Sequence, residues 1–449
     1  MRTGFFVGQI LPELPEDGDE IGHVDFASSY PAQMICSAEF PAGRLMDCTS
    51  SVQKIDDLEY YCKNYWVILR VIFEDLELKN PYFTKCPYIP VSKTIREPRR
   101  RGIYDNGRII KQPGYVEFCF LGCEWPIIRQ QYQGKIITIK EAYYAPKGYL
   151  PGQIRQECLK WYRLKTELKG VEGKKYEYMK AKNRTNSSYG MAVEKPIKDI
   201  MSVDELLNIK MQEPSEDESR NQLEKFYSPM QRKFLAYQWG ITVTALARIE
   251  HMRMIAICGN DFIYGDTDSV FFLHPELHKE HIENYNKVWM KYALSCGLPF
   301  SATDPEGTEH PLGVAEWEES CTQFVTLGAK KYALKKLVMD KKTGEQREQL
   351  EITVAGVPKK QGSALLGDLK KFRPEFVFMV SDDASLEERQ GWKKTLHYHD
   401  TGFMMEIDGH ILDVGSGIGM TRTPYEMDLK PEYRMLTGYQ DIELQDDVF

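Results

Sequence analysis

Two short apolar runs flank a turn that carries two carboxylates. The runs are Phe262–Tyr264 and Val270–Phe272, and residues 265–269 between them read Gly-Asp-Thr-Asp-Ser. β-Branched and aromatic residues on both sides of a Gly-Asp pair predict a β-hairpin with Asp266 and Asp268 at its tip. Glycine and aspartate are also common in purely structural turns, so the hairpin alone does not establish a functional site.

A second strand is expected to end on an aspartate near the start of the chain, at residues 24–26, which include Asp25. If this strand lies beside the hairpin in one sheet, Asp25, Asp266 and Asp268 converge. Mg²⁺ prefers carboxylate oxygens, and two such ions roughly 3.5–4 Å apart can hold the attacking and leaving oxygens of a phosphoryl transfer. The three aspartates therefore predict a site for two Mg²⁺ ions, for which Mn²⁺ can substitute.

A basic helix supplies a second set of candidate residues. Lys182 and Asn186 are four residues apart and Tyr189 follows three later, so the three share one helical face. A lysine there can meet the β and γ phosphates of a nucleotide, and Tyr189 can lie under its base. Gly190 leaves room for a base pair. A solvated basic helix ending at an Asn-Ser turn is the structural alternative.

Two further tyrosines are candidates for contacts to sugar and nucleic acid. Tyr30 comes five residues after Asp25 and is expected beneath the sugar of the nucleotide, where its ring would exclude a 2′-OH. A core tyrosine before Pro31 is the alternative. Lys330 and Tyr332 would share one face of a strand, suited to holding a primer strand near its end.

The formal net charge of −8 does not exclude a nucleic-acid partner, because the charge is unevenly distributed. Residues 92–111 carry seven Lys or Arg against two acidic residues, and residues 155–184 carry ten against four. Three adjacent arginines in the first segment are expected to contact phosphates, with a solvated turn as the alternative: Arg99, Arg100 and Arg101.

The cysteines and the apolar runs indicate in which cellular compartment the chain is expected. The ten cysteines show no regular spacing, and Cys119 and Cys123 lack a second pair, so no zinc ribbon is predicted. Free thiols fit a reducing cytoplasm. We find no signal peptide and no apolar run of about 18 residues, so neither secretion nor membrane insertion is expected. A cytoplasmic location, in the host if the chain is viral, is the expectation.

Mixed helix and strand patterns predict an α+β fold. Residues 65–73 are rich in β-branched and aromatic residues and predict a strand, whereas residues 154–185 predict a basic helix interrupted near residues 170–173. A second helix is expected to end at Gly259. Its apolar face is expected to comprise Ile241, Ala245, Ile249, Met252 and Ala256.

These motifs together resemble those of family B DNA polymerases. Residues 25–31 look like the first palm motif, residues 182–190 like the fingers motif, and residues 264–269 like the complete second palm motif. The resemblance implies an α+β right-hand fold with an antiparallel-sheet palm, helical fingers and thumb, and two inserted subdomains. It also implies a DNA-directed DNA polymerase that uses a DNA template and primer and adds dNTPs to a 3′ hydroxyl by a two-metal mechanism.

The resemblance further implies roles for single residues. The metal ligands would be Asp25, Asp268, Asp266 and the carbonyl of Phe26. The catalytic set would be Asp25, Asp266, Asp268 and Lys182. Nucleotide contacts would come from Tyr30, Ser28, Phe26, Lys165, Asn186, Tyr189 and Gly190. The primer would be held by Lys330 and Tyr332. Lys174 competes with Lys165 as the second triphosphate lysine, because matching this segment to the family needs a short gap.

Three segments look like the protein-primed branch found in phages and adenoviruses: residues 30–34, 227–230 and 241–248. That branch has two insertions, which would correspond to residues 80–135 and 195–227. By resemblance the first would contact a terminal protein or duplex, and the second would close a ring for processivity. A terminal protein is therefore an expected partner.

The resemblance divides the chain into six parts. They are 1–79, palm; 80–137, first inserted subdomain; 138–194, palm edge and fingers; 195–228, second inserted subdomain; 229–340, palm; and 341–449, thumb and C-terminal extension. Ser29 departs from the family's usual leucine. Family members also carry a 3′–5′ exonuclease domain before the first palm motif, which needs on the order of 100 residues. Because 24 residues precede Asp25, we expect proofreading to come from a separate exonuclease polypeptide, whether the chain is naturally split or trimmed.

Two alternatives remain at this point. A non-catalytic DNA-binding subunit of a replication complex could keep the fold, although decay of a carboxylate or of Lys182 would then be expected. An RNA-directed polymerase is disfavoured, because such enzymes usually carry adjacent aspartates and not the Asp-Thr-Asp of residues 266–268.

Overall fold

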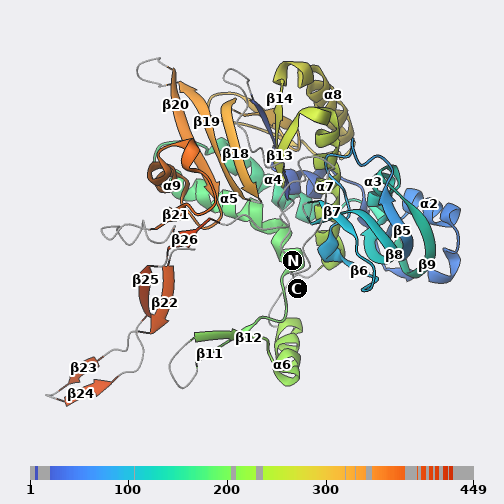
Figure 1. Cartoon of the computed structure of the whole chain (residues 1–449), viewed down its shortest axis with the longest axis horizontal. Coiled ribbons are helices and arrows are strands. Elements are labelled where there is room, and N and C mark those ends of the chain that lie inside the picture. Colours follow the sequence, from blue (N-terminus) through green and yellow to red (C-terminus); the bar gives the residue numbers. More distant parts are fainter. Residues whose placement is uncertain are drawn as a thin grey trace.

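Two antiparallel sheets and a long helix between them organise the chain (Figure 1). The computed structural model describes residues 6–8, 21–105, 107–203, 209–228, 236–318, 320–328, 330–339, 346–379, 392, 396–400, 404–407, 410–413, 418–422 and 424–427. The mixture of helices with antiparallel sheets confirms the expected α+β class.

The first sheet contains the predicted hairpin. Its strands run in the order β1-β13-β14-β2-β18-β19-β20, and β17 also pairs with β2. Their bounds are β1 (Phe6–Gly8), β2 (Ile21–Phe26), β13 (Phe262–Asp266), β14 (Ser269–Leu273), β17 (Ala315–Trp317), β18 (Cys321–Gly328), β19 (Lys331–Met339) and β20 (Gln346–Val354). The hairpin and the strand ending at residues 24–26 are thus confirmed, and they are neighbours in one sheet.

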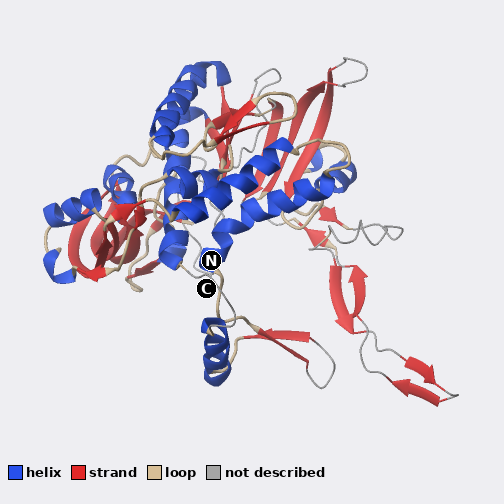
Figure 2. Cartoon of the chain, turned by 180° about the vertical axis from the view of Figure 1, so that it is seen from behind, coloured by secondary structure: helices blue, strands red, loops and turns tan. Residues whose placement is uncertain are grey.

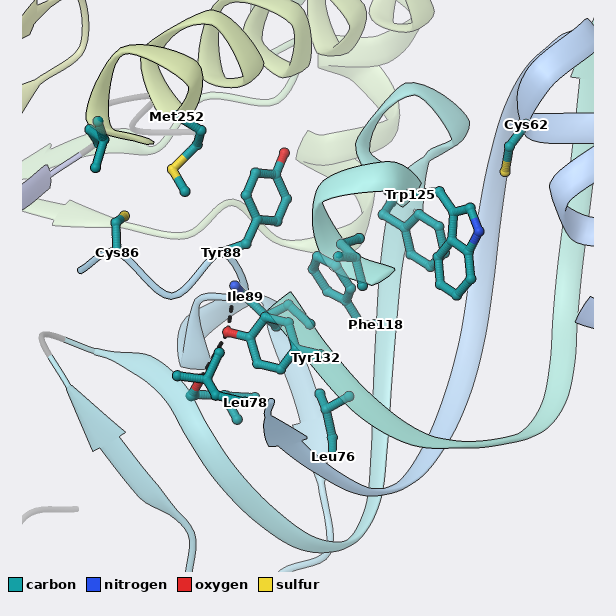
Figure 3. Close-up of a cluster of buried hydrophobic side chains, with 14 of the residues drawn as sticks. Cys62, Leu76, Leu78, Cys86, Tyr88, Ile89, Phe118, Trp125, Tyr132 and Met252 are labelled. Atoms are coloured by element: carbon teal, nitrogen blue, oxygen red, sulfur yellow. Dashed lines mark hydrogen bonds between the residues drawn. The ribbon is translucent and has the colours of Figure 1, made fainter. Parts of the chain in front are cut away.

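The second sheet is built on three long strands. Its order is β4-β9-β5-β8-β6, with β7 paired to β8. The bounds are β4 (Met46–Asp47), β5 (Trp66–Leu78), β6 (Thr94–Arg96), β7 (Ile103–Asp105), β8 (Arg108–Leu121) and β9 (Tyr132–Ala145). Figure 3 shows part of its core, where the Tyr132 hydroxyl accepts from the Ile89 amide at 3.2 Å and donates to the Ile109 carbonyl at 2.8 Å.

This second sheet crosses two of the expected domain boundaries. β5 lies before residue 80, yet it pairs along its length with both β8 and β9. β9 itself runs across the boundary expected between residues 137 and 138. Residues 80–137 therefore do not form a separate sheet. The physical reason is that an apolar strand such as β5 can pair with strands that are distant in the sequence. The residue pattern of a strand does not show which strands it pairs with.

Helices pack against both sheets, and α7 lies between the two. Their bounds are α1 (Ser29–Cys36), α2 (Ile55–Asn64), α3 (Trp125–Gln131), α4 (Gly152–Glu167), α5 (Lys175–Gly190), α6 (Glu216–Tyr227), α7 (Tyr237–Cys258), α8 (Pro275–Leu294) and α9 (Lys359–Leu366). The expected break between α4 and α5 is confirmed, and Gly170 and Gly173 both have positive φ there. None of the helices in the described segments is long and apolar enough to cross a lipid bilayer.

Helix α7 is buried on most sides and not along a single face. Met252, Ile255 and Cys258 share one core with residues of both sheets. Ala256, which we expected on the buried face, is exposed. Because α7 packs against two sheets, its buried residues do not follow the single apolar face of an amphipathic helix. The helix ends at Gly259, whose φ is +55°, as expected.

Small elements extend from this body. β11 (Ile200–Val203), β12 (Ile209–Gln212) and α6 lie in the segment where the second insertion is expected, and they project away from the sheets in Figures 1 and 2. Pro229 and Met230, part of the segment 227–230, lie outside the described residues. Other two-stranded pairs are β3 (Phe40–Pro41) with β10 (Lys147–Gly148) and β15 (Ser301–Thr303) with β16 (Glu309–Pro311).

The C-terminal part is mostly β-structure. After residue 340 the described residues form β20, β21 (Val377–Phe378), β22 (Leu396–Asp400), β23 (Met404–Ile407), β24 (His410–Asp413), β25 (Ile418–Arg422) and β26 (Tyr425–Glu426), with α9 the one α-helix among them. The helical thumb that the resemblance implies is not confirmed by the described residues of this segment. Residues 346–354 pair with β19 and carry α9 on that sheet, so the first sheet extends into the C-terminal segment.

Candidate active site

Strand register brings the carboxylates together. Asp25 on β2 lies opposite Ser269 on β14, and Ser269 lies opposite Asp266 on β13. Because directly opposed residues of antiparallel strands point to the same face, Asp25 and Asp266 lie on one face of the sheet. The opposite face, with Val24 and Phe272, packs in the core shared with α7. The carboxylates therefore lie on the side of the sheet that faces away from α7.

The turn between the aspartates has an unusual backbone. Thr267 has a φ of +63°, which is rare for a β-branched residue. The Asp268 amide donates to the Asp266 carbonyl at 2.7 Å, and the Phe26 amide donates to the Asp268 carbonyl at 2.9 Å. These bonds tie the turn to the end of β2, so Asp268 is held beside Asp25 and Phe26.

Gly265 is required by close packing beneath this turn. A Cβ on Gly265 would lie 2.7 Å from the ring of His251 on α7. His251 Nε2 lies 3.0 Å from the Ser269 carbonyl, and burial lowers the pKa of His251 to about 4. A neutral histidine thus supports the hairpin from behind, and no larger residue fits at position 265 without movement.

Burial and repulsion dominate the electrostatics of the carboxylates. Burial raises the pKa of Asp25 to about 8, and the carboxylate of Asp268 adds to the shift. Burial also raises the pKa of Asp268 to about 6, with repulsion from Asp266 as the next cause. Lys165 opposes both shifts. A bound cation would favour the ionised forms, so the donor set fits a divalent metal.

Asp266 already has a cationic partner. Lys330 Nζ donates to both of its carboxylate oxygens, at 3.1 and 2.8 Å, and Asp266 is 9% exposed. The position of Lys330 differs from the expectation: it precedes β19 with a φ of +54°, so it does not share a strand face with Tyr332. Its amide donates to the Tyr264 hydroxyl at 3.2 Å. A turn between β18 and β19 aims the lysine at the hairpin, which spacing alone could not show.

A cluster of packed aromatic side chains lies beside the carboxylates. Tyr264 lies 5.1 Å from Tyr332 and 5.5 Å from Phe324, ring centre to ring centre. Phe271 packs on the same group, 4.8 Å from Phe324. Burial raises the pKa of Tyr332 to about 12. Tyr332 is therefore one member of an aromatic cluster that supports the hairpin.

Of the two competing candidates for the second triphosphate lysine, Lys165 is the one that reaches the candidate site. Its Nζ donates to the Ser28 hydroxyl at 2.7 Å, and Ser28 has a φ of +50° where β2 turns into α1. Burial lowers the pKa of Lys165, with repulsion from Lys169 and Lys182 adding to it. Lys174, the competing candidate, instead lies 2.9 Å from Glu177 on α5.

Helices α1 and α5 meet through two tyrosines. The rings of Tyr30 and Tyr189 lie 4.8 Å apart, edge to face. Lys182 and Asn186 are exposed on α5, about two turns and one turn before Tyr189 respectively, as the spacing predicted. A Cβ on Gly190 would meet no atom within 4 Å. Figure 2 shows α4 and α5 side by side, so the residues from both helices approach the same region.

The fold is similar to that of phi29 DNA polymerase. The structure of that polymerase complexed with primer-template DNA superposes with a TM-score of 0.59 at 16% identity, covering 95% of this chain and 61% of that chain. Its ternary complex with primer-template DNA and incoming nucleotide gives a TM-score of 0.58, with the same identity and coverage. Its complex with single-stranded DNA gives 0.56, covering 92% of this chain and 60% of that chain. The chain thus spans about three fifths of the length of these structures.

Comparisons of the sequence with family models and with curated proteins found no relative of this chain. At 16% identity the likeness concerns the fold. The functional assignment therefore depends on the geometry of the site.

The three arginines lie apart from the carboxylates in the fold. Arg99, Arg100 and Arg101 are exposed between β6 and β7, on the second sheet. Exposed arginines suit phosphate contact.

No group of three or more His, Cys, Asp or Glu side chains in metal-binding arrangement occurs in the described segments. A Mg²⁺ site with two carboxylates normally completes its coordination with water and substrate phosphates.

Two acidic residues near Asp25 were not identified from the sequence. Glu316 on β17 lies directly opposite Asp25, and the Glu318 amide donates to the His23 carbonyl at 2.9 Å. Both carboxylates contribute to the raised pKa of Asp25, after burial and Asp268. The sequence signal for these residues was a pair of glutamates with one residue between them, at the end of a short strand. Nothing in the sequence indicated that this strand pairs with β2.

Proposed function

We propose that the chain is a template-directed DNA polymerase that adds deoxynucleotides to a 3′ hydroxyl with two Mg²⁺ ions. The observation that carries this proposal is the convergence of Asp25 and Asp268 at the end of β2, with Lys165 close enough to lower the pKa of both carboxyls. The similarity to phi29 DNA polymerase complexes with primer-template DNA supports DNA as the partner.

The carboxylates would hold the metal ions. Asp25 and Asp268 would be the ligands, with the carbonyl of Phe26 as an additional donor, because the three are tied together at the end of β2. When bound, the two ions would neutralise the triphosphate and activate the 3′ hydroxyl. Asp266 would support the turn, since Lys330 already neutralises it.

The nucleotide would lie between the carboxylates and helices α4 and α5. Lys165 and Lys182 would bind the triphosphate as point charges, and Asn186 would lie on the same face. Tyr30 would lie against the sugar and Tyr189 under the base. The edge-to-face contact of their rings supports this placement.

The elements map onto a right-hand polymerase in this proposal. The first sheet would be the palm, α4 and α5 the fingers, and the β-rich C-terminal segment the thumb. Lys330 and Tyr332 would act near the primer end, chiefly by supporting the hairpin. Arg99, Arg100 and Arg101 would contact nucleic acid from the second sheet. A terminal protein remains a proposed partner.

Primer extension tests the proposal. The parent chain, Asp268→Asn and the control Asp56→Asn, an exposed residue of α2, would be compared on a labelled DNA primer and template with Mg²⁺ and dNTPs. We expect extension by the parent and the control, and none by Asp268→Asn, with DNA binding kept by all three. Synthesis by Asp268→Asn would overturn the metal assignment. DNA binding without extension by any of them would indicate a non-catalytic subunit.

A further inference from the structure

A histidine lies between two carboxylates beside the candidate metal site. His310 is on β16, and its Nδ1 lies 2.7 Å from a Glu316 carboxylate oxygen while its Nε2 lies 3.1 Å from Asp304. Each ring nitrogen faces a carboxylate acceptor, and both nitrogens can donate only when the ring is doubly protonated and positively charged. Burial acts against this charge, but the hydrogen bonds that the ring makes to the Glu316 and Asp304 carboxylates outweigh it and raise the pKa of His310.

The ring is held from its far side. Asp304 accepts from the amides of Glu306 at 3.0 Å and Thr308 at 2.9 Å, so its carboxylate is anchored in its own turn. The His310 carbonyl accepts from the Tyr162 hydroxyl of α4 at 2.7 Å. Tyr162 also lies below Lys165, whose Nζ is 5.3 Å from the ring centre. The histidine is thus fixed against the helix that carries Lys165.

The other end of this chain of contacts is the candidate metal ligand. Glu316 lies directly opposite Asp25 in the pairing of β17 with β2. Like charges directly opposite each other on antiparallel strands are destabilising unless a counter-charge is present. His310 supplies such a counter-charge to Glu316, and its ring also limits where the Glu316 carboxylate can lie.

We propose that His310 is a positioning residue, which Asp304 orients and which holds the Glu316 carboxylate in one place beside Asp25. The effect on catalysis rests on the proposed function, since it requires Asp25 to bind a divalent ion. Without His310 the Glu316 carboxylate would be an unrestrained negative charge next to Asp25, and the metal site would lose its defined geometry. Groups that orient the residues around a metal site typically change metal affinity or activity by about 10–100-fold.

The test is a double-mutant cycle on the full chain with two readouts. Mn²⁺ binding by titration calorimetry and dNTP incorporation on primed DNA would be measured for the parent, His310→Gln, Glu316→Gln and the double variant. His281→Gln, an exposed histidine of α8, is the matched control. We expect His310→Gln to weaken Mn²⁺ binding about tenfold or more in the parent background. We expect no further loss when it is added to Glu316→Gln, because the residue acts through Glu316.

Each outcome decides between the inferences. Equal losses in both backgrounds, or no loss in either, would overturn the role of His310. Coupling in Mn²⁺ binding without extension by the parent would support the positioning role and overturn the polymerase proposal. Extension by the parent without coupling in Mn²⁺ binding would support the polymerase proposal and overturn the role of His310. A parent that binds no Mn²⁺ would overturn both proposals. If thermal melting shows that His310→Gln does not fold, Asp304→Asn tests the same chain of contacts. The carbonyl oxygen of the new asparagine can still accept the turn's hydrogen bonds, while the second carboxylate beside His310 is removed.

Discussion

The ring of Tyr30 on α1 meets the ring of Tyr189 on α5 edge to face, with their centres 4.8 Å apart. Tyr30 follows closely after Asp25 and Tyr189 follows Lys182, so one aromatic contact links the carboxylate end of the sheet to the basic helix. Helix α1 also packs on α4, which carries Lys165. The nucleotide contacts proposed above therefore come from elements that already touch in the unliganded chain.

Removing the Tyr30 ring is expected to relax sugar selection. Tyr30→Ala would open space for a 2′-OH, so the preference for dNTPs over rNTPs should fall by roughly 10–100-fold. The measurement is kcat/KM for a matched dNTP and rNTP in single-nucleotide extension. Tyr60→Ala, at an exposed tyrosine of α2, should leave the ratio unchanged. An unaltered preference in Tyr30→Ala would place the ring away from the sugar.

Two lysines of the basic region are expected to differ in their effect on nucleotide binding. Lys165 bonds Ser28 near Asp25, whereas Lys174 pairs with Glu177. Lys165→Ala should raise the KM for dNTPs by roughly 10–100-fold, which corresponds to the loss of one charge-assisted hydrogen bond. Lys174→Ala should change it less than about twofold, since exposed ion pairs contribute little. Steady-state extension kinetics would distinguish them, and the opposite ranking would reverse the assignment.

Asp25→Asn is expected to abolish synthesis while stabilising the metal-free chain. The folded-state pKa of Asp25, about 8, lies above its ordinary value of 3.8. Its contribution to stability is therefore fully present below about pH 4 and is lost as the pH rises toward 8. The neutral asparagine should increase the stability at pH 8 by about 1–3 kcal/mol and by less at pH 5. Thermal melting in EDTA at both pH values checks this, and a lower melting temperature for the variant at pH 8 would contradict it.

The contact between Lys330 and Asp266 is expected to stabilise the hairpin. Lys330→Ala would leave the nearly buried Asp266 carboxylate without its cation, at a cost of about 1–3 kcal/mol. Adding Asp266→Asn should recover part of that loss, because the unpaired charge is removed. Chemical denaturation of the single and double variants measures both steps. Lys360→Ala, an exposed lysine of α9, should stay within about 0.5 kcal/mol of the parent.

Local features of the site could be predicted from residue types and spacing. The hairpin around residues 265–269, the strand ending at Asp25 and the helix stop at Gly259 all follow from short-range preferences. The shared face of Lys182 and Asn186 follows from helical geometry in the same way. These features need only a few neighbouring residues, and the structure confirms them.

Long-range partners could not be predicted in this way. β5 pairs with β8 and β9 across an expected domain boundary, and the C-terminal segment adds β20 to the first sheet. Helix α7 packs against two sheets, so its buried residues are not confined to the single apolar face that the sequence predicted. In each case the deciding contact is with residues distant in the chain, and an apolar pattern does not specify which distant surface will cover it.

The sequence by itself determined which chemistry-bearing residues the chain carries and where its hairpin turns, because turn and strand preferences act over a few residues. Only the tertiary structure decided that Lys330 neutralises Asp266, that Lys165 and not Lys174 reaches Ser28, and that Glu316 with His310 lies opposite Asp25. Strand register and helix packing set these contacts. Both depend on how separate apolar faces are buried together, and no single segment of the sequence contains that information.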